Sequence, residues 1–401
     1  MRKTTEIICS VLVVVFFLVV IFGLGVRSVY ENVTNYTDYS YYENRNLAAF
    51  PEKDKAAVLD GSFFSSVETW CRDHLAERDA ILTEHTLLNM NVLDRPVVNE
   101  VVITDGVLLP YNKPEVLNQK DINVRSDMMA SRLRSHADVT EANGGQFIYV
   151  AVPCQYVYYE DSYPWYLNSR AEFTEASSTA LFKALDQKSV PYIDMRERFD
   201  DLGHLPEYSS TVDNHYSIFG AYETYRAIME KYNAASGAAL PILTDKDYTV
   251  TTLPNPYIGS RTRKLLGLWK SDEHLSIITP NTDVPFTRWN YGNEKPGSSK
   301  VYSLPATDTE DTLYRLYMGD DCSETKIATD RPDLPTVLIY GDSFTNAVES
   351  IIWYNFDTMY SFDLRYYKEK PLEELIAAIK PDLVVCIRDY EALLTLEANG
   401  Q

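Results

Sequence analysis

Two short motifs more than a hundred residues apart contain the residue types of a serine triad. The first is Asp213-Asn214-His215 and the second is Gly341-Asp342-Ser343-Phe344. A serine hydroxyl is a weak nucleophile at neutral pH, so it needs a histidine to accept its proton and a carboxylate to orient that histidine. The two motifs therefore predict acyl-transfer chemistry with Ser343 as the nucleophile, His215 as the general base and Asp213 as the orienting acid.

The segments around the two motifs are expected to hold these side chains in place. The apolar, β-branched run 336–340 precedes Gly341, and residues 345–348 follow the motif, which predicts a strand, a tight turn and the start of a helix. Ser343 would then lie at the carboxyl end of a strand, where α/β proteins place their functional residues, with its backbone N–H directed at a developing oxyanion. A helix start at about 217–220 would hold the Asp-His pair at a helix N-terminus.

Each of these residues also has a purely structural interpretation. Asp213 and Ser343 could each cap the helix that follows, which is a common use of both residue types. His215 is one of six histidines, and a lone histidine more often lies in the core or on the surface than in a catalytic site. Asp342 could join Asp213 and His215 as a metal ligand, but no further histidine or carboxylate has a suitable spacing. We therefore favour the triad and expect no metal and no cofactor.

The rest of the chain alternates helices with short apolar strands from about residue 120. Asn143-Gly144-Gly145 ends one predicted helix, because glycine is the usual residue after a helix C-terminus. Buried parallel strands that alternate with helices predict an α/β fold, a three-layer α/β/α sandwich. The expected helices cover about 124–137, 171–186 and 372–379, and the expected parallel strands are 147–152, 192–194, 336–340 and 383–387.

Three further predicted segments lie before and between these elements. An amphipathic helix is expected from Ser62, and a β-hairpin with an Asp-Gly turn at 101–109. Residues 245–335 are rich in Pro, Gly, Asn, Thr and Tyr and predict a β-rich insertion, with strand-like pieces at 248–251 and 300–303. The insertion contains the basic residues Arg261, Arg263, Lys264 and Lys270, which form either a solvated hairpin face or a groove for an anionic ligand.

The N-terminus predicts a membrane helix. After Arg2 and Lys3, residues 7–26 carry no charge, and this length suffices to cross about 30 Å of hydrocarbon. The flanking charges favour an uncleaved type II anchor with the N-terminus in the cytoplasm, and a cleaved signal peptide is the alternative. We expect residues 1–27 to form a cytoplasmic tip and anchor, residues 28–60 a polar, Tyr-rich tether and residues 61–401 an extracellular domain.

Composition limits the possible partners. The chain has 401 residues and a formal net charge of −21, which argues against nucleic acid because phosphate binding needs clustered Lys and Arg. Four cysteines, Cys71, Cys154, Cys322 and Cys386, would lie outside the cell, where disulfides persist, and their pairing is left open. Their spacing shows no metal pattern, and Cys386 lies in an apolar run typical of a buried strand.

The motifs and their order resemble those of the DHHW proteins and of the alginate O-acetylation proteins of the AlgX and AlgJ type. Asp213-Asn214-His215-Tyr216-Ser217, followed by Gly220-Ala221, is similar to the family signature Asp-x-His-Trp-Thr-x-x-Gly-Ala. Further matching blocks in the family's order cover nearly the whole chain after the anchor. These blocks are Glu43-Asn44-Arg45, Asp73-His74, Arg78-Asp79, Tyr257-Ile258-Gly259-Ser260, the serine motif, Asp363-Leu364-Arg365-Tyr366 and Pro381-Asp382.

The resemblance implies an SGNH-hydrolase-like fold in which the motifs occur in permuted order, with the Asp-His pair before the serine. It also implies O-acetyl transfer onto an extracellular polysaccharide, with the acetyl group delivered by a separate membrane-bound O-acyltransferase. By this resemblance Ser343 is the nucleophile, His215 the base and Asp213 its orienter, and Arg365 positions the substrate or supports the site. Asn346 is a candidate for the oxyanion hole.

This chain departs from the family pattern in several places. Pro153-Cys154-Gln155 stands where relatives often have Pro-Asn-Lys, so a positive charge is missing near the end of that strand. The Gly-x-Asn-Asp block of standard SGNH hydrolases was not found. Two other functions therefore stay open beside the transferase. One is an esterase that uses the same triad with water, and the other is an inactive polysaccharide-binding scaffold.

Overall fold

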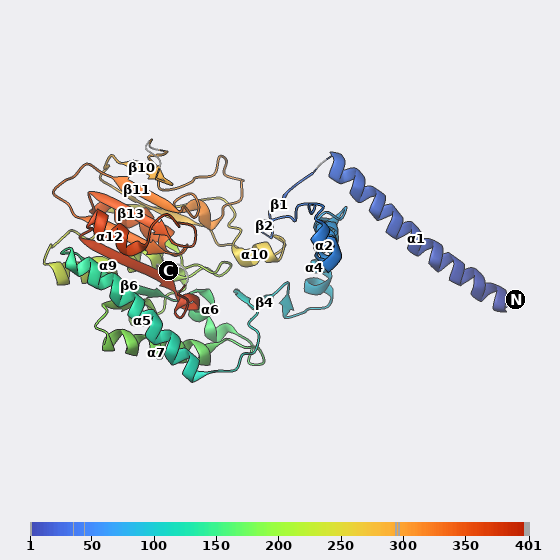
Figure 1. The fold of residues 1–401 in the computed structure, drawn as a ribbon, viewed down its shortest axis with the longest axis horizontal. Helices are drawn as coiled ribbons and strands as arrows, with labels where there is room; N and C mark the ends of the chain where they lie inside the picture. Colours follow the sequence, from blue (N-terminus) through green and yellow to red (C-terminus); the bar gives the residue numbers. More distant parts are fainter. Residues whose placement is uncertain (1, 35, 44, 293–294, 296, 397–401) are drawn as a thin grey trace. The chain divides into compact units, whose positions relative to one another are not determined.

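The computed structural model describes the chain except residues 1, 35, 44, 293–294, 296 and 397–401, and it gives only the backbone of residues 2–6. Asn44 of the Glu-Asn-Arg block thus lies outside the described residues. The chain forms two compact units (Figure 1), one of residues 1–99 with 263–269 and one of residues 100–262 with 270–401. The domain start that we expected at residue 61 stays a prediction.

The N-terminal unit begins with the long helix α1 (Arg2–Thr34). From Ile7 to Thr34 this helix is apolar and long enough to cross a membrane, and none of its most apolar part is buried, which fits a signal anchor or a signal sequence. The first residues of the expected polar tether, 28–34, are helical, because α1 continues to Thr34. Its last turns are tied to the loop after α3: Ser28 Oγ accepts from Ala76 N at 2.8 Å, and Asn32 Nδ2 donates to the His74 carbonyl at 2.9 Å.

The remainder of this unit is mostly helical. The predicted helix from Ser62 is confirmed as α3, and its last residue, Asp73, accepts two hydrogen bonds from the Arg45 guanidinium, at 2.6 and 2.7 Å. The elements are β1 (Tyr39–Ser40), β2 (Arg45–Asn46), α2 (Lys55–Asp60), α3 (Ser62–Asp73), α4 (Arg78–Leu87), a π-helical turn (Leu88–Val92) and β3 (Val97–Val98).

The larger unit is built on a mixed, mostly parallel sheet of seven strands in the order β10-β11-β13-β12-β14-β6-β7. The five strands from β13 to β7 are parallel, and β11 and β10 extend the sheet antiparallel at one edge. The strands are β6 (Gln146–Val152), β7 (Tyr192–Asp194), β10 (Thr287–Asn290), β11 (Glu324–Ala328), β12 (Thr336–Gly341), β13 (Thr358–Asp363) and β14 (Leu383–Asp389). The four predicted parallel strands are confirmed, and β10, β11 and β13 are strands that the sequence analysis did not assign.

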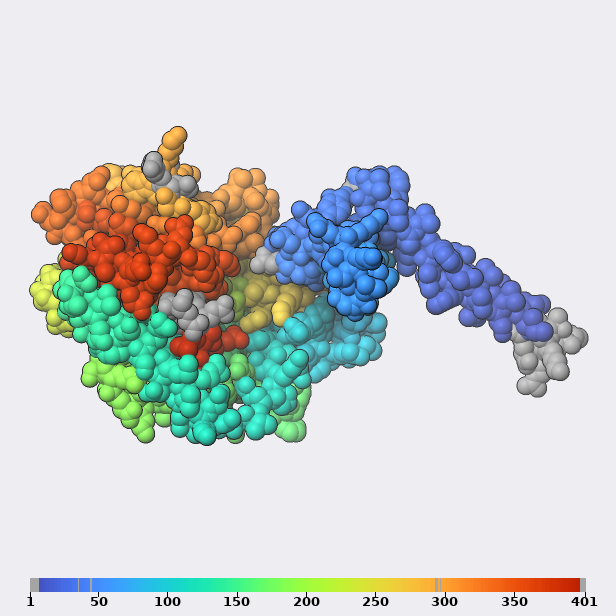
Figure 2. Space-filling model, in the orientation of Figure 1, coloured from blue at the N-terminus to red at the C-terminus, as the bar shows by residue number. Residues whose placement is uncertain are grey.

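Helices cover both faces of the sheet. The connection from β12 to β13 runs toward one edge and that from β13 to β14 toward the other, so right-handed crossovers place α11 (Thr345–Ile352) and α12 (Leu372–Ile379) on opposite faces. Helix α9 (Ile218–Ser236) packs against α11, whereas α5 (Gln119–Ala142) packs against α7 (Ala171–Gln187) and α12. Figure 2 shows the teal surface of α5 beside the orange-red surface of the segment that contains α12.

Part of the segment 245–335 joins the main sheet, and part of it forms a separate pair of strands. Strands β8 (Tyr248–Thr252) and β9 (Ser276–Pro280) form a separate antiparallel pair, while β10 and β11 of the same segment join the main sheet. The expected strand at 300–303 is wrong, because only Tyr302 forms an isolated bridge, to Tyr317. The predicted hairpin is confirmed as β4 (Val101–Ile103) and β5 (Leu108–Pro110).

The shorter helices and the cysteines complete the description. The remaining α-helices are α6 (Gln155–Tyr158), α8 (Met195–Asp201) and α10 (Ser260–Lys264). Within the described residues no two cysteines form a disulfide. Cys386 is fully buried in β14, as its apolar run predicts.

Candidate functional site

The serine lies in a tight turn between β12 and α11. The strand ends at Gly341, where an added Cβ would lie 2.0 Å from the Ile387 carbonyl oxygen of β14, so only glycine fits this close approach. The next residue, Asp342, accepts from Phe344 N at 3.0 Å, and its other carboxylate oxygen lies 3.3 Å from Arg388 Nε. Because these contacts fix the turn, the Ser343 side chain is presented at the carboxyl end of the sheet.

The structure brings the three predicted residues together in a hydrogen-bonded row. Ser343 Oγ lies 2.7 Å from His215 Nε2, and His215 Nδ1 lies 2.5 Å from Asp213 Oδ1. An ionised carboxylate can only accept, so Nδ1 carries the proton and Nε2 is free to take the serine proton. Asp213 and His215 are buried and Ser343 is half-buried, so the nucleophile faces solvent while its base is shielded.

Asp213 is held as an anion by several donors. Its Oδ1 also accepts from His215 N at 3.1 Å, and its Oδ2 accepts from Ser260 N at 2.5 Å. Burial alone would raise the pKa of this carboxyl, but His215 and the two backbone N–H groups hold that pKa well below its usual range. The acid therefore stays charged throughout the physiological pH range.

Gly259 and Ser260 from a distant segment, and Ser210 from the same loop, fix the backbone around Asp213. A Cβ on Gly259 would lie 2.3 Å from the Val212 carbonyl oxygen, so this glycine lets the segment 257–260 approach closely enough for Ser260 to reach Asp213. Ser210 Oγ accepts from Asp213 N at 3.0 Å. The Tyr-Ile-Gly-Ser block that the resemblance identified thus supplies the third partner of the triad acid.

The helix-capping interpretations do not hold. Helix α9 is capped by Ser217, whose Oγ accepts from Phe219 N and Gly220 N, and not by Asp213. Helix α11 begins after Phe344 and has no side-chain cap, so Ser343 does not serve there either. Both residues are thereby left for the contacts with His215.

An aromatic ring from the insertion covers the histidine. The Tyr314 ring is stacked on the His215 imidazole, with centroids 3.6 Å apart and an angle of 3° between the planes. This contact keeps the imidazole in the plane that reaches both Ser343 and Asp213. The sequence analysis missed Tyr314, because one tyrosine among 30 carries no signal of its own.

The position that lacks the family lysine contacts the triad loop. Gln155 is fully buried, its N–H donates to the Asn214 carbonyl at 3.1 Å, and its Nε2 donates to the Ser210 carbonyl at 3.1 Å. Its Oε1 accepts from Arg261 Nε at 3.3 Å. The Arg261 guanidinium thus supplies a positive charge next to Gln155, where the family lysine is missing. Arg261 belongs to the short helix α10, so of the two alternatives for the basic cluster the hairpin face does not hold at this residue.

The two supporting candidates lie close to each other. Asn346 Nδ2 donates to Asp321 Oδ1 at 3.0 Å, and Arg365 forms ion pairs with Asp321 at 2.8 Å and with Asp363 at 2.6 Å. Both side chains therefore contact Asp321, Asn346 from the first turn of α11 and Arg365 from the residues after β13. Their roles in the oxyanion hole or in substrate positioning stay predictions.

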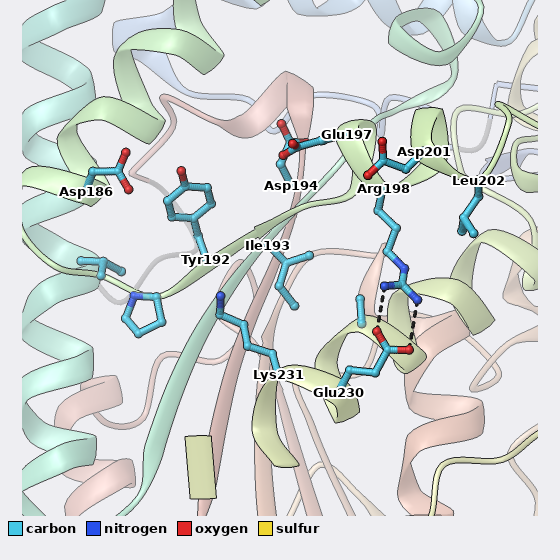
Figure 3. Close-up of a pocket in the computed structure, with 13 residues that line it drawn as sticks. Asp186, Tyr192, Ile193, Asp194, Glu197, Arg198, Asp201, Leu202, Glu230 and Lys231 are labelled. Carbon is cyan, nitrogen blue, oxygen red and sulfur yellow. Dashed lines mark hydrogen bonds and ion pairs between the residues drawn. The ribbon is translucent and has the colours of Figure 1, made fainter. Parts of the chain in front are cut away.

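Two cavities lie near these elements. One of about 230 Å³ adjoins the triad loop and is lined by Tyr314, Tyr216 and the start of α9. Another, of about 750 Å³, lies between β7, α8 and α9 (Figure 3) and contains no triad residue; Arg198 and Glu230 form an ion pair in it. Among the described residues, no group of three or more His, Cys, Asp or Glu is arranged to hold a metal ion.

Solved structures match this chain, although no family model and no curated protein does. PatB1 of Bacillus cereus, solved with a sulfonyl adduct, is 19% identical with a TM-score of 0.59 over 73% of this chain and 94% of that one. A DHHW family protein from Eubacterium siraeum is 18% identical with a TM-score of 0.57 over 76% and 95%. The O-acetyltransferase domain of Pseudomonas putida AlgJ is 15% identical with a TM-score of 0.43 over 74% and 92%.

The matches to the PatB1 and DHHW-family structures agree in fold with the resemblance that the motifs carry. The chain has the α/β fold, with a mixed and mostly parallel central sheet, of the PatB1 and DHHW-family structures.

Proposed function

We propose that this chain is a membrane-anchored O-acetyltransferase that moves an acetyl group through an acyl-Ser343 intermediate onto a polysaccharide outside the cell. The observation that carries the proposal is the continuous row from Ser343 Oγ through His215 to the Asp213 carboxylate. The likeness to the PatB1 and DHHW structures and the family motifs support it. We interpret the fold as an SGNH-like three-layer sandwich with permuted order, because the Asp-His pair precedes the serine.

The first half-reaction would load the serine. Ser343 Oγ attacks the carbonyl carbon of an acetyl donor while His215 Nε2 takes the hydroxyl proton. The bond from that carbon to the donor's leaving group then breaks, and His215 returns the proton to the leaving group. Asp213 stabilises the imidazolium that exists between these two steps.

The second half-reaction would transfer the acetyl group to a sugar. A sugar hydroxyl gives its proton to His215 Nε2 and attacks the acetyl carbon, and Ser343 leaves and regains the proton. The products are an acetylated sugar and the free enzyme. In line with the family resemblance, a membrane-bound O-acyltransferase is the proposed source of acetyl groups.

The contacts of α1 support an uncleaved anchor. Ser28 and Asn32 bond to the loop at 74–76, and Arg27 forms an ion pair with Glu77. Cleavage after about residue 27 would remove Arg27 and its ion pair with Glu77, whereas Ser28 and Asn32 would stay on the folded unit. We therefore propose a single-pass type II protein whose catalytic unit lies outside the cell.

The proposal is tested with the full-length protein in detergent. A sulfonyl fluoride should label Ser343, since sulfonyl reagents attack activated hydroxyls, and mass spectrometry locates the adduct. Ser343→Ala should lose the label and reduce acetyl transfer from p-nitrophenyl acetate to de-acetylated envelope polysaccharide by at least about a thousand-fold. Ser131→Ala, an exposed serine on α5, is the matched control and should behave as wild type.

The same assay separates the three functions. Acetyl release that requires the polysaccharide supports the transferase. Equal release with water alone would instead indicate an esterase, and a wild-type protein that takes no label would indicate an inactive scaffold.

A further inference from the structure

Two neighbouring loops of the larger unit expose an unusual set of apolar side chains. Trp165 is 94% exposed, Val116 93% and Tyr166 55%, and Tyr111 and Leu117 are exposed beside them in sequence. The other four tryptophans of the chain are buried or half-buried. Because large aromatic residues gain most from burial, an exposed cluster of this kind indicates a binding surface. We name these five residues the aromatic ledge.

Polar contacts hold the two loops of the ledge together. Asn112 and Asn168 form an antiparallel bridge, and Asn168 Nδ2 donates to the Lys113 carbonyl at 2.9 Å. An ion pair at 2.8 Å joins Arg170 to Glu115. The exposed rings therefore stand on fixed backbone, and a ligand that binds them loses little affinity to loop ordering.

The second loop of the ledge leaves the sheet at the carboxyl ends of the parallel strands, where the triad also lies. This loop follows β6 and α6, and β6 lies parallel to β14, which lies parallel to β12, the strand that ends before Ser343. Gln155 at the start of α6 donates to the carbonyl of Asn214, inside the Asp-x-His motif. Tyr163, two residues before Trp165, donates to the Pro110 carbonyl and accepts from Asn112. A chain of bonded residues thus connects the triad loop with the ledge.

We propose that the aromatic ledge binds the sugar rings of the polysaccharide that accepts the acetyl group, an inference that rests on the proposed function. One face of a pyranose ring presents C–H groups, and these pack against the electron-rich face of a Trp or Tyr ring. A long polymer can bind the ledge while another of its sugars lies at Ser343. The net charge of −21 disfavours anionic lipid as the occupant, because like charges repel the loops from such a surface.

The test measures binding of the full-length protein in nanodiscs to the de-acetylated envelope polysaccharide of the producing organism. Trp165→Ala and Trp165→Leu should each weaken binding roughly ten-fold or more, since exposed tryptophans dominate such contacts, and should raise KM for the polysaccharide. Trp165→Tyr, which keeps a ring, should stay within about three-fold of wild type. Tyr291→Ala, an exposed aromatic outside the ledge, is the control and should bind normally.

Each outcome decides the inference. Unchanged binding by Trp165→Ala overturns it, and so does wild-type binding by Trp165→Leu, because a leucine supplies apolar area without a ring. Binding to phosphatidylglycerol vesicles that Trp165→Ala abolishes, with polysaccharide binding intact, would assign the ledge to the membrane. Sulfonyl labelling of Ser343 should be equal in all variants, which shows that they fold. A further result is a wild-type protein that shows no sulfonyl labelling of Ser343 while Trp165→Ala still weakens polysaccharide binding. That result would contradict the proposed function and would support polysaccharide binding by the ledge.

Discussion

At the scale of single residues, Asp213 is the most restrained member of the triad. Its two carboxylate oxygens accept from the His215 ring, from His215 N and from Ser260 N, so the side chain cannot rotate without losing a bond. The carboxylate is the one group here that forces the histidine proton onto Nδ1. Its contribution to catalysis is therefore the tautomer of His215.

Asp213→Asn tests this role without changing the volume of the side chain. The amide would place a donor against Nδ1, so the proton moves to Nε2 and the serine loses its base. We expect sulfonyl labelling of Ser343 and acetyl transfer to slow by roughly 10⁴-fold, as for the equivalent change in a serine protease triad.

A second Asp-His pair provides the control for this variant. His204 Nδ1 lies 2.7 Å from Asp200 Oδ1 on the exposed surface. Asp200→Asn should leave both rates unchanged. An Asp213→Asn protein that reacts at the wild-type rate would show that the row is structural.

The residues of the site differ in how far the sequence predicts them. Asp213, His215 and Ser343 stand in motifs whose spacing already indicates acyl transfer. Ser260 and Tyr314 are common residue types, and their roles depend on contacts that form only when segments from different parts of the chain come together. Pattern reasoning reached Ser260 only through the family resemblance and did not reach Tyr314.

At the scale of elements, the turn between β12 and α11 depends on the missing side chain of Gly341. Gly341→Ala would drive a methyl group into the Ile387 carbonyl, and β12 and β14 would have to separate where they pair in the centre of the sheet. We expect a loss of at least about 2 kcal/mol of unfolding free energy, as for other forced overpacking, together with loss of labelling at Ser343.

Urea unfolding followed by circular dichroism measures this effect. Gly297→Ala is the control, because nothing lies within 4 Å of an added Cβ at that position. Equal midpoints for the two variants would contradict the steric explanation of the turn.

The elements themselves were predictable where local pattern decides them. The helix at 372–379 and the apolar strands β6, β12 and β14 follow from periodicity, since burial on both faces gives continuous apolar runs. Strands β10 and β11 contain Thr, Arg, Asn, Glu and Lys, and they are strands because β13 pairs with β11 and β11 in turn pairs with β10. Such pairing depends on a strand that lies much later in the chain, so the residues of β10 and β11 alone do not predict it.

At the scale of the whole molecule, the predicted orientation has a direct test. The protein purified from membranes should retain the residues before Arg27 in peptide mass mapping, because the apolar segment is longer than a usual signal-peptide core and no Ala-x-Ala cleavage site follows it. Cys71 is exposed, so a membrane-impermeant maleimide added to whole cells should label it, and Cys71→Ser should lose that label.

Two results would contradict the anchor. A mature protein that begins after about residue 27 would show a cleaved signal sequence. A Cys71 that reacts only after the cells are opened would reverse the topology.

The separation of 128 sequence positions between His215 and Ser343 also sets the order in which the site can be completed. In the proposed topology the chain leaves the cytoplasm from the anchor onward, so the base and its acid arrive outside first. Ser260 and Tyr314 follow, and the nucleophile comes last. A chain halted during export after His215 would have its general base outside the cell but no serine nucleophile. Reactivity toward esters would therefore begin only after most of the protein has left the cell.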